Sequence, residues 1–170
     1  DFVNVILDLG LKPVFVEIDN DTKSFNFNDL QNKITSNTRV ILATYLTGIV
    51  PDLKKLEKIS KEKNLYLIED ISQSYGSKYM NKFAGSYGFA AIGSLSPGKI
   101  ISSIGGGFIL MDSKKHSDLI NQYMLEDLTV PQGALLLFPI KSVQRAKPIM
   151  ILRSIQKQMS SLIKRFMRIA

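Results

Sequence analysis

Short apolar runs alternate along this chain with segments of helical periodicity, and no other feature of the sequence constrains the fold as strongly. The apolar runs predict strands at 13–19, 39–45, 65–70, 89–94 and 107–112. The intervening segments predict amphipathic helices at 26–35 and 51–63. Strands that alternate with helices are joined by right-handed crossovers into a mostly parallel sheet with helices on its faces. The sequence therefore predicts an α/β fold with three layers, α/β/α.

Glycines mark two further features of the predicted fold. Gly10 follows the apolar residues 2–9, which predict the end of a helix that this glycine caps. The link from Ser94 to Gly107 leaves little room for a crossover helix, so the last strand is predicted to run antiparallel to its neighbour. The run Gly105–Gly107 leads into that strand rather than into a helix, and therefore favours a tight turn over a phosphate loop.

The residue types that are rare or absent narrow the possible chemistry. A chain of 170 residues is long enough for one domain with its own core. It has no cysteine, which excludes disulfides and thiolate metal sites and fits a reducing compartment. Its single histidine, His116, argues against a histidine metal site or a histidine-dependent triad. No signal-peptide pattern and no apolar run as long as a membrane span is visible. We therefore expect a cytoplasmic protein without a bound metal.

The net charge of +7 comes entirely from the C-terminal part of the chain. Residues 1–127 hold 14 Lys/Arg and 15 Asp/Glu, whereas residues 128–170 hold 8 basic residues and no acidic one. Apolar residues at alternating spacings of 3 and 4 predict a helix over 148–170; they are Leu152, Ile155, Met159, Leu162, Phe166 and Ile169. This helix either starts a C-terminal domain or lies on anionic lipid as a peripheral membrane contact. A nucleic-acid partner is not expected, because no aromatic platform accompanies the charge.

Three side chains that could carry chemistry fall at or just beyond the ends of predicted strands. Asp70 ends one strand, Ser94 ends the next, and Lys99 lies in the following turn. Because ligands of open α/β sheets bind outside the carboxyl ends of the strands, we expect the three groups to converge. Glu69 precedes Asp70 and faces the opposite side of the strand, so only one of the two acids serves such a site. Taken singly, Asp70 is better explained as a turn cap and Lys99 as a surface lysine.

Together, an amine and a carboxylate at neighbouring strand ends fit the chemistry of pyridoxal 5'-phosphate. A lysine holds the cofactor aldehyde as a Schiff base, and a carboxylate keeps the ring nitrogen protonated so that the ring acts as an electron sink. Lys99 follows a Pro-Gly pair and precedes Ile100 and Ile101, which predicts a constrained turn against apolar residues. Ser94 offers a hydroxyl to a phosphate at the same strand end. The sequence therefore predicts Lys99 as the catalytic residue and pyridoxal 5'-phosphate as the cofactor.

In order along the chain, these motifs resemble those of the DegT/DnrJ/StrS family of sugar aminotransferases. The resemblance runs from about Leu9 to Asp112 and rests on the order and spacing of segments 10–19, 38–42, 47–48, 68–76, 85–86, 94–99 and 106–107. It implies a pyridoxal-phosphate enzyme of the aspartate-aminotransferase fold (fold type I), in which residues 1–127 form part of the large domain. It further implies a homodimer that moves an amino group from an amino acid, with glutamate the expected donor, to a nucleotide-linked keto-sugar in amino-sugar or surface-glycan biosynthesis.

The resemblance also implies a role for each residue of the site. Asp70 would pair with the pyridine nitrogen, and Gln73 would lie near the phenolic oxygen of the cofactor. Ser94 would bind the phosphate, and Lys99 would form the Schiff base and shuttle the proton. In the sugar dehydratases among the relatives a histidine replaces this lysine, so Lys99 favours transamination. The chain departs from the family pattern at Tyr45, Ser72, Ser74, Leu95 and Gly105, where histidine, alanine, alanine, an aromatic residue and glutamate are usual.

The first residues of the chain suggest that it is a fragment. It begins at Asp1 without a methionine and inside an apolar helical stretch, so we expect about half of such an enzyme. The family's phosphate cradle and ring-stacking aromatic residue would then precede Asp1. The alternative, from another functional class, is a truncated and catalytically silent domain whose basic segment 128–170 binds a membrane or a partner protein.

Overall fold

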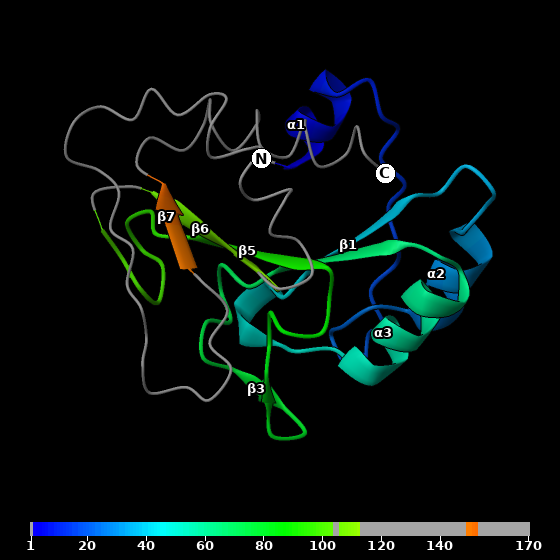
Figure 1. Ribbon diagram of the computed structural model, residues 1–170. Helices are drawn as coiled ribbons and strands as arrows, with labels where there is room; N and C mark the ends of the chain where they lie inside the picture. Colours follow the sequence, from blue (N-terminus) through cyan, green and yellow to red (C-terminus); the bar gives the residue numbers. More distant parts are fainter. Residues whose placement is uncertain (1, 104–105, 113–148, 153–170) are drawn as a thin grey trace.

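A five-stranded sheet forms the centre of the fold (Figure 1). The computed structural model describes residues 2–103, 106–112 and 149–152. In spatial order the strands are β1 (Val40–Thr44), β2 (Tyr66–Asp70), β5 (Ala90–Ser94), β6 (Gly107–Met111) and β7 (Ile149–Leu152). β1, β2 and β5 pair in parallel, whereas β6 pairs antiparallel with both β5 and β7. The predicted reversal of the strand at 107–112 is therefore confirmed, and the other strands of this sheet share one direction.

The two helices predicted between strands begin where the sequence offers capping side chains. α2 (Phe27–Lys33) begins after Asn26, whose Oδ1 accepts two backbone N–H hydrogen bonds of 3.1 Å. α3 (Leu53–Glu62) begins after Asp52, whose Oδ1 accepts the N–H of Lys55 at 3.0 Å. The helices predicted at 26–35 and 51–63 are thus confirmed, each with slightly narrower limits.

The predicted glycine cap of the first helix is also confirmed. α1 (Phe2–Asp8) ends just before Gly10, which adopts a φ of +71° that other residues rarely take. The N–H of Gly10 bonds to the carbonyl of Leu7 at 2.9 Å, and the N–H of Leu11 bonds to that of Ile6 at 3.1 Å. This pair of bonds is a Schellman motif, which satisfies the last carbonyls of the helix.

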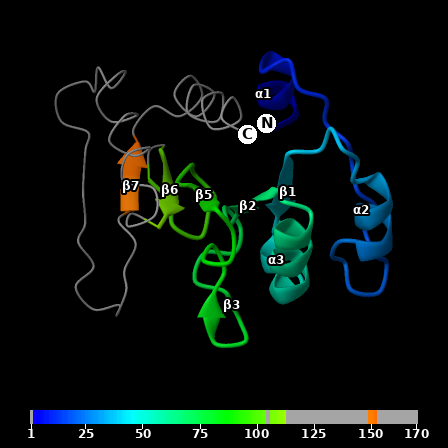
Figure 2. The same ribbon diagram turned by 45° about the vertical axis from the view of Figure 1, so that its right-hand side comes forward.

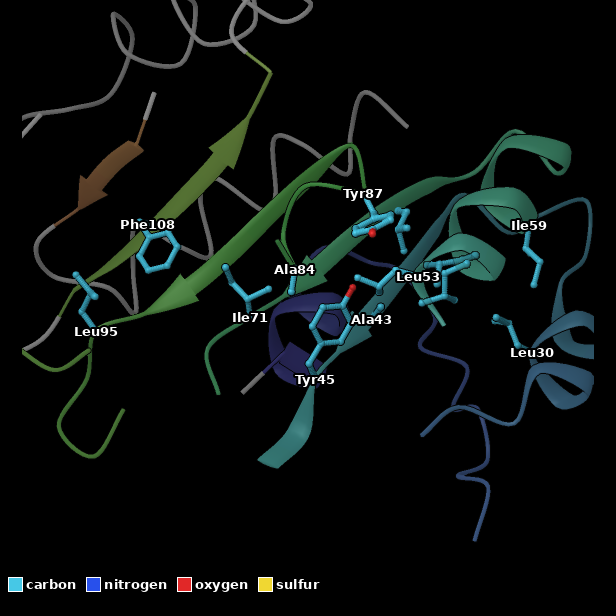
Figure 3. Packing of buried hydrophobic residues seen from close by; sticks show 13 residues of the cluster. Leu30, Ala43, Tyr45, Leu53, Ile59, Ile71, Ala84, Tyr87, Leu95 and Phe108 are labelled. Atoms are coloured by element: carbon cyan, nitrogen blue, oxygen red, sulfur yellow. The ribbon is translucent and has the colours of Figure 1, made fainter. Parts of the chain in front are cut away.

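Helices cover both faces of the sheet, as the three-layer prediction requires. One face packs against α2 and α3 (Figure 3) through the buried residues Leu30, Ile41, Ala43, Leu53, Leu56, Ile59 and Leu67. The opposite face buries Ala90, Ile92, Ile109 and Met111, with the partly buried Phe2 of α1 packed against them. Figures 1 and 2 both place α1 and α3 on opposite sides of the sheet. Burial of each leucine side chain contributes about 1.5–3 kcal/mol, so these clusters hold the layers together.

A small hairpin projects from the sheet on the side away from α1 (Figure 2). It consists of β3 (Lys78–Tyr79) and β4 (Lys82–Phe83), which pair antiparallel. The two residues between these strands, Met80 and Asn81, both have positive φ, at 46° and 63°. Two successive positive φ values are the signature of a type I′ turn, whose twist matches that of the strands it joins.

Residues 13–19, predicted as a strand, do not join the sheet, and this prediction is wrong. Among the described residues the segment forms only an isolated bridge between Ile18 and Phe25. The backbone groups of Glu17 bond to the start of α2 instead, its N–H to Asp29 Oδ2 at 2.8 Å and its carbonyl to the N–H of Asn26 at 2.9 Å. An apolar run becomes a strand only where a neighbour accepts its backbone hydrogen bonds, and here these bonds go elsewhere.

The helix predicted over 148–170 is wrong for its first residues, because Ile149–Leu152 form strand β7. These residues supply the backbone partners for the outer edge of β6, with Leu110 opposite Ile149 and Gly107 opposite Leu152. The remainder of that helix and His116 lie outside the described residues, and the division at 127/128 stays a prediction. No helix in the described part of the chain is long and apolar enough to span a membrane.

Candidate functional site

The carboxyl ends of β1, β2 and β5 meet at one edge of the sheet, where the predicted site residues lie. Thr44 of β1 lies opposite Asp70 of β2, and Asp70 in turn lies opposite Ile92 of β5. Backbone bonds continue just past these pairs, from the N–H of Tyr45 to the carbonyl of Asp70 at 3.1 Å, and from the N–H of Ile71 to that of Ile92 at 2.9 Å. The parallel register therefore places Asp70 and the end of β5 side by side.

A series of hydrogen bonds joins Asp70 to the end of β5. Asp70 is buried, with 4% of its surface exposed, and its Oδ1 accepts the N–H of Ser72 at 3.0 Å. The Oγ of Ser72 accepts the N–H of Ser94 at 3.0 Å. The Oγ of Ser94 then accepts the N–H of Ser96 at 3.2 Å and donates to the Oγ of Ser96 at 2.9 Å. The structure thus brings together Asp70 and Ser94, which the sequence singled out, and Ser72 links the carboxylate of Asp70 to the backbone N–H of Ser94.

Lys99 occupies the last position of a tight turn that follows Ser96. Its N–H bonds to the carbonyl of Ser96 at 3.2 Å, and Gly98 has a φ of +86°. Proline followed by glycine with positive φ defines a type II turn, which explains the Pro-Gly pair. Lys99 is half-buried. The apolar shield expected from the next two residues is absent, since Ile100 is 62% and Ile101 is 42% exposed.

Gln73 connects the end of β2 with the turn that follows β1. Its side-chain Oε1 accepts the N–H of Thr47 at 2.8 Å, within the short helical turn η1 (Leu46–Gly48). Thr47 has a φ of +54° and Gly48 one of +80°, so the chain bends sharply here. Because Oε1 is used in this contact, the amide NH2 of Gln73 is the group left to meet a ligand.

Glu69 faces the other side of the strand, as predicted, and takes a structural role that the sequence did not suggest. It is fully buried, and its carboxylate accepts the hydroxyl of Tyr45 at 2.9 Å and the N–H groups of Gly85 and Tyr87, each at 2.7 Å. A fourth bond comes from the N–H of Gly88 at 2.5 Å. Burial and the charge of Glu69 raise the pKa of Tyr45, so its hydroxyl stays protonated and donates.

Sequence reasoning also missed Ser72, which links the other two site groups. The only hint in the sequence was that serine stands at positions 72 and 74, where the family usually has alanine. The structure shows that Ser72, and not Ser74, bonds to Ser94.

No group of three or more acidic or histidine side chains suited to a metal ion occurs among the described residues.

The α/β fold, with polar side chains gathered at the carboxyl ends of parallel strands, resembles that of aminotransferases with solved structures. The model of the DegT/DnrJ/EryC1/StrS aminotransferase family matches residues 2–131, and the chain belongs to this family. Aminotransferases of the family use pyridoxal 5'-phosphate, and Spr1654 from Streptococcus pneumoniae, 27% identical with a TM-score of 0.59, has been solved in its PLP form. That comparison covers 62% of this chain and 31% of the other.

Two further comparisons support the same assignment. The GDP-perosamine synthase of Escherichia coli O157:H7 is 32% identical over 128 residues, which are 75% of this chain and 35% of the relative. A DegT/DnrJ/EryC1/StrS aminotransferase from Brucella abortus has a TM-score of 0.66 and 25% identity, over 72% of this chain and 35% of the other. The chain spans about a third of the length of the curated relatives it matches.

Proposed function

We propose that this chain supplies the cofactor centre of an aminotransferase that moves an amino group from an amino acid, with glutamate as the expected donor, to a nucleotide-linked keto-sugar. The observation that carries the proposal is the hydrogen-bonded series from Asp70 through Ser72 to Ser94, which leads directly into the turn of Lys99. The likeness to GDP-perosamine synthases supports a nucleotide-linked sugar as the acceptor.

The donor set at the sheet edge fits pyridoxal 5'-phosphate. A buried carboxylate needs a donor or a cation as partner, and among the described residues only the N–H of Ser72 bonds to the carboxylate of Asp70, at Oδ1. Its Oδ2 therefore remains for the protonated ring nitrogen. The hydroxyl of Ser94 suits an ester phosphate, and the NH2 of Gln73 suits the phenolic oxygen. When bound, the cofactor supplies an electron sink for the carbon that exchanges its proton.

Each residue of the chain has a distinct task in this proposal. Asp70 holds a proton on the ring nitrogen, because its negative charge favours the cationic ring. Ser94 would hold the phosphate and Gln73 the phenolic oxygen, and these two contacts would orient the reacting carbon. Lys99 Nζ would hold the cofactor through its aldehyde and would carry the proton that transamination moves.

Borohydride reduction of the complete protein with pyridoxal 5'-phosphate tests this assignment. We expect the reduced label on Lys99 after peptide mapping, and loss of the label in Lys99→Arg. Lys78 and Lys82 serve as internal controls, since their ammonium groups lie over the rings of Phe83 and Tyr87 at 4.7 and 4.0 Å from the ring centroids. Label on either control with Lys99 unmodified would contradict the proposal.

We also propose that the complete enzyme is a cytoplasmic homodimer. The absence of cysteine from the chain fits a reducing compartment, and the resemblance to the family supports the dimer. Sedimentation velocity of the complete protein at micromolar concentration should give a dimer, and cell fractionation should recover it with the soluble enzymes. A monomer that remains active would contradict the proposed assembly.

A further inference from the structure

Two serines follow β2 within one turn of chain, and within the part of the chain that the structure describes only one of them has a hydrogen-bond partner for its hydroxyl. Ser74 is fully buried, and its Oγ has no hydrogen-bond partner among the described residues. Ser72 is half-buried, and its Oγ accepts the N–H of Ser94 at 3.0 Å. The two hydroxyls therefore differ in what they do, although the residue type is the same.

The bond from Ser94 to Ser72 replaces a missing rung of the sheet. The parallel pairing of β2 with β5 reaches the bond from the N–H of Ile71 to the carbonyl of Ile92. The next rung would join the N–H of Ser94 to the carbonyl of Ile71, but that carbonyl accepts the N–H of Ser74 at 3.0 Å. The hydroxyl oxygen of Ser72 takes over as acceptor, so the end of β5 stays attached to β2.

We propose that Ser72 is a positioning residue of the cofactor site, which holds the hydroxyl of Ser94 at a fixed place relative to the carboxylate of Asp70. This inference rests on the proposed function, in which Ser94 binds the phosphate and Asp70 binds the ring nitrogen. Ser72 serves both ends, since its N–H bonds to Asp70 and its Oγ bonds to Ser94. It links the two groups that would hold the ring nitrogen and the phosphate of one ligand.

The two bonds of Ser72 can be separated by mutation. Ser72→Ala keeps the backbone N–H that orients Asp70 but removes the acceptor for Ser94, so only the phosphate end of the site loses its support. Ser94 also orders the N–H of Ser96 through its own Oγ, and this contact would loosen with it. We therefore expect weaker binding of the phosphorylated cofactor and unchanged binding of pyridoxal, which lacks the phosphate.

Titration of the complete apoprotein with pyridoxal 5'-phosphate and with pyridoxal measures this difference, followed by the visible absorbance of the bound aldehyde. Ser72→Ala should weaken binding of the phosphorylated ligand about fivefold, the loss of one hydrogen bond, while pyridoxal binds as it does to the wild type. Ser74→Ala is the matched control and should change neither affinity. Ser72→Thr, which keeps the hydroxyl, should restore the wild-type ratio of the two affinities, whereas Ser72→Val of the same volume should not.

The comparison of Thr with Val keeps the test valid if Ser72→Ala does not fold. In a Ser94→Ala background, Ser72→Ala should have no further effect on the ratio, because the residue acts through Ser94. An unchanged ratio, or an equal loss for both ligands, would overturn the role of Ser72 and leave the proposed function intact. Failure of the wild-type protein to bind either aldehyde through Lys99 would overturn the proposed function and this inference with it.

Discussion

Replacement of Glu69 by glutamine tests how the loop beyond β4 is held against the sheet. The Oε2 atom of Glu69 accepts the hydroxyl of Tyr45 at 2.9 Å and the N–H of Gly85 at 2.7 Å. The Oε1 atom accepts the N–H groups of Tyr87 and Gly88 at 2.7 and 2.5 Å. Glutamine has the same shape but only one acceptor oxygen, so one of these pairs must face an NH2 group.

The cost of this change follows from the contacts. In the least costly orientation the amide oxygen stays on Tyr87 and Gly88, because the Tyr45 hydroxyl can turn and accept from the new NH2. The buried N–H of Gly85 is then left without an acceptor, at a cost of about 1–3 kcal/mol. The two retained bonds lose a charged acceptor and weaken by about 1 kcal/mol each. Relief from burying a charge offsets part of this, so we expect a net loss of about 2–4 kcal/mol.

Urea unfolding of the complete protein measures the change in the free energy of unfolding. Tyr45→Phe is the matched control, because it removes one donor and leaves the carboxylate with three backbone N–H groups, at an expected cost of about 1 kcal/mol. Glu69→Gln should therefore destabilise clearly more than Tyr45→Phe. Equal losses for the two variants would refute the argument that the carboxylate itself organises residues 85–88.

Three further predictions follow from the same contacts and from the charge of the C-terminal segment. Asp70→Asn should lower kcat/KM by about 10²-fold or more, as the loss of other preorganised charges does. The urea midpoint should change little, because the amide oxygen still accepts the N–H of Ser72. Near-normal turnover would contradict this prediction. Ser74→Ala should raise the free energy of unfolding by about 1 kcal/mol, since it removes a buried hydroxyl that has no hydrogen-bond partner among the described residues. A lower free energy of unfolding measured in urea would contradict this. If residues 148–170 contact membranes, the protein should bind anionic vesicles, and salt should weaken this binding. The binding should disappear when five basic residues become glutamine: Arg153, Lys157, Lys164, Arg165 and Arg168. Binding that survives these substitutions would exclude the contact.

The elements that could be predicted are those whose hydrogen bonds are settled locally. α2 and α3 carry their own caps in Asn26 and Asp52, and Gly10 ends α1 with bonds inside one turn. The segment 13–19 and residues 149–152 were predicted wrongly for one reason. An apolar segment becomes a strand or something else according to which distant backbone lies beside it, and that partner is not encoded in its own pattern.

The position of Asp70 and Ser94 at one edge of the sheet was predictable, but their contacts were predictable only in part. Asp70, Ser94 and Lys99 could be placed near one edge because parallel strands end together. The bond from Ser94 to Ser72 was not predictable, since it depends on the carbonyl of Ile71 being taken by Ser74. The apolar shield expected for Lys99 was wrong because the type II turn directs the chain outward at Ile100.

The position of Ser94 depends on the whole of β5, which is attached to β2 at both ends. At the start of β5 the N–H of Phe89 bonds to the carbonyl of Leu67 at 2.8 Å, and a Cβ on Gly88 would collide with that same carbonyl. At its far end the hydroxyl of Ser72 holds Ser94. Gly88 and the hydroxyl of Ser72 thus act on the same pairing, because both bring β5 against β2. A larger residue at position 88 should therefore shift Ser94 relative to Asp70 through the spacing of the two strands.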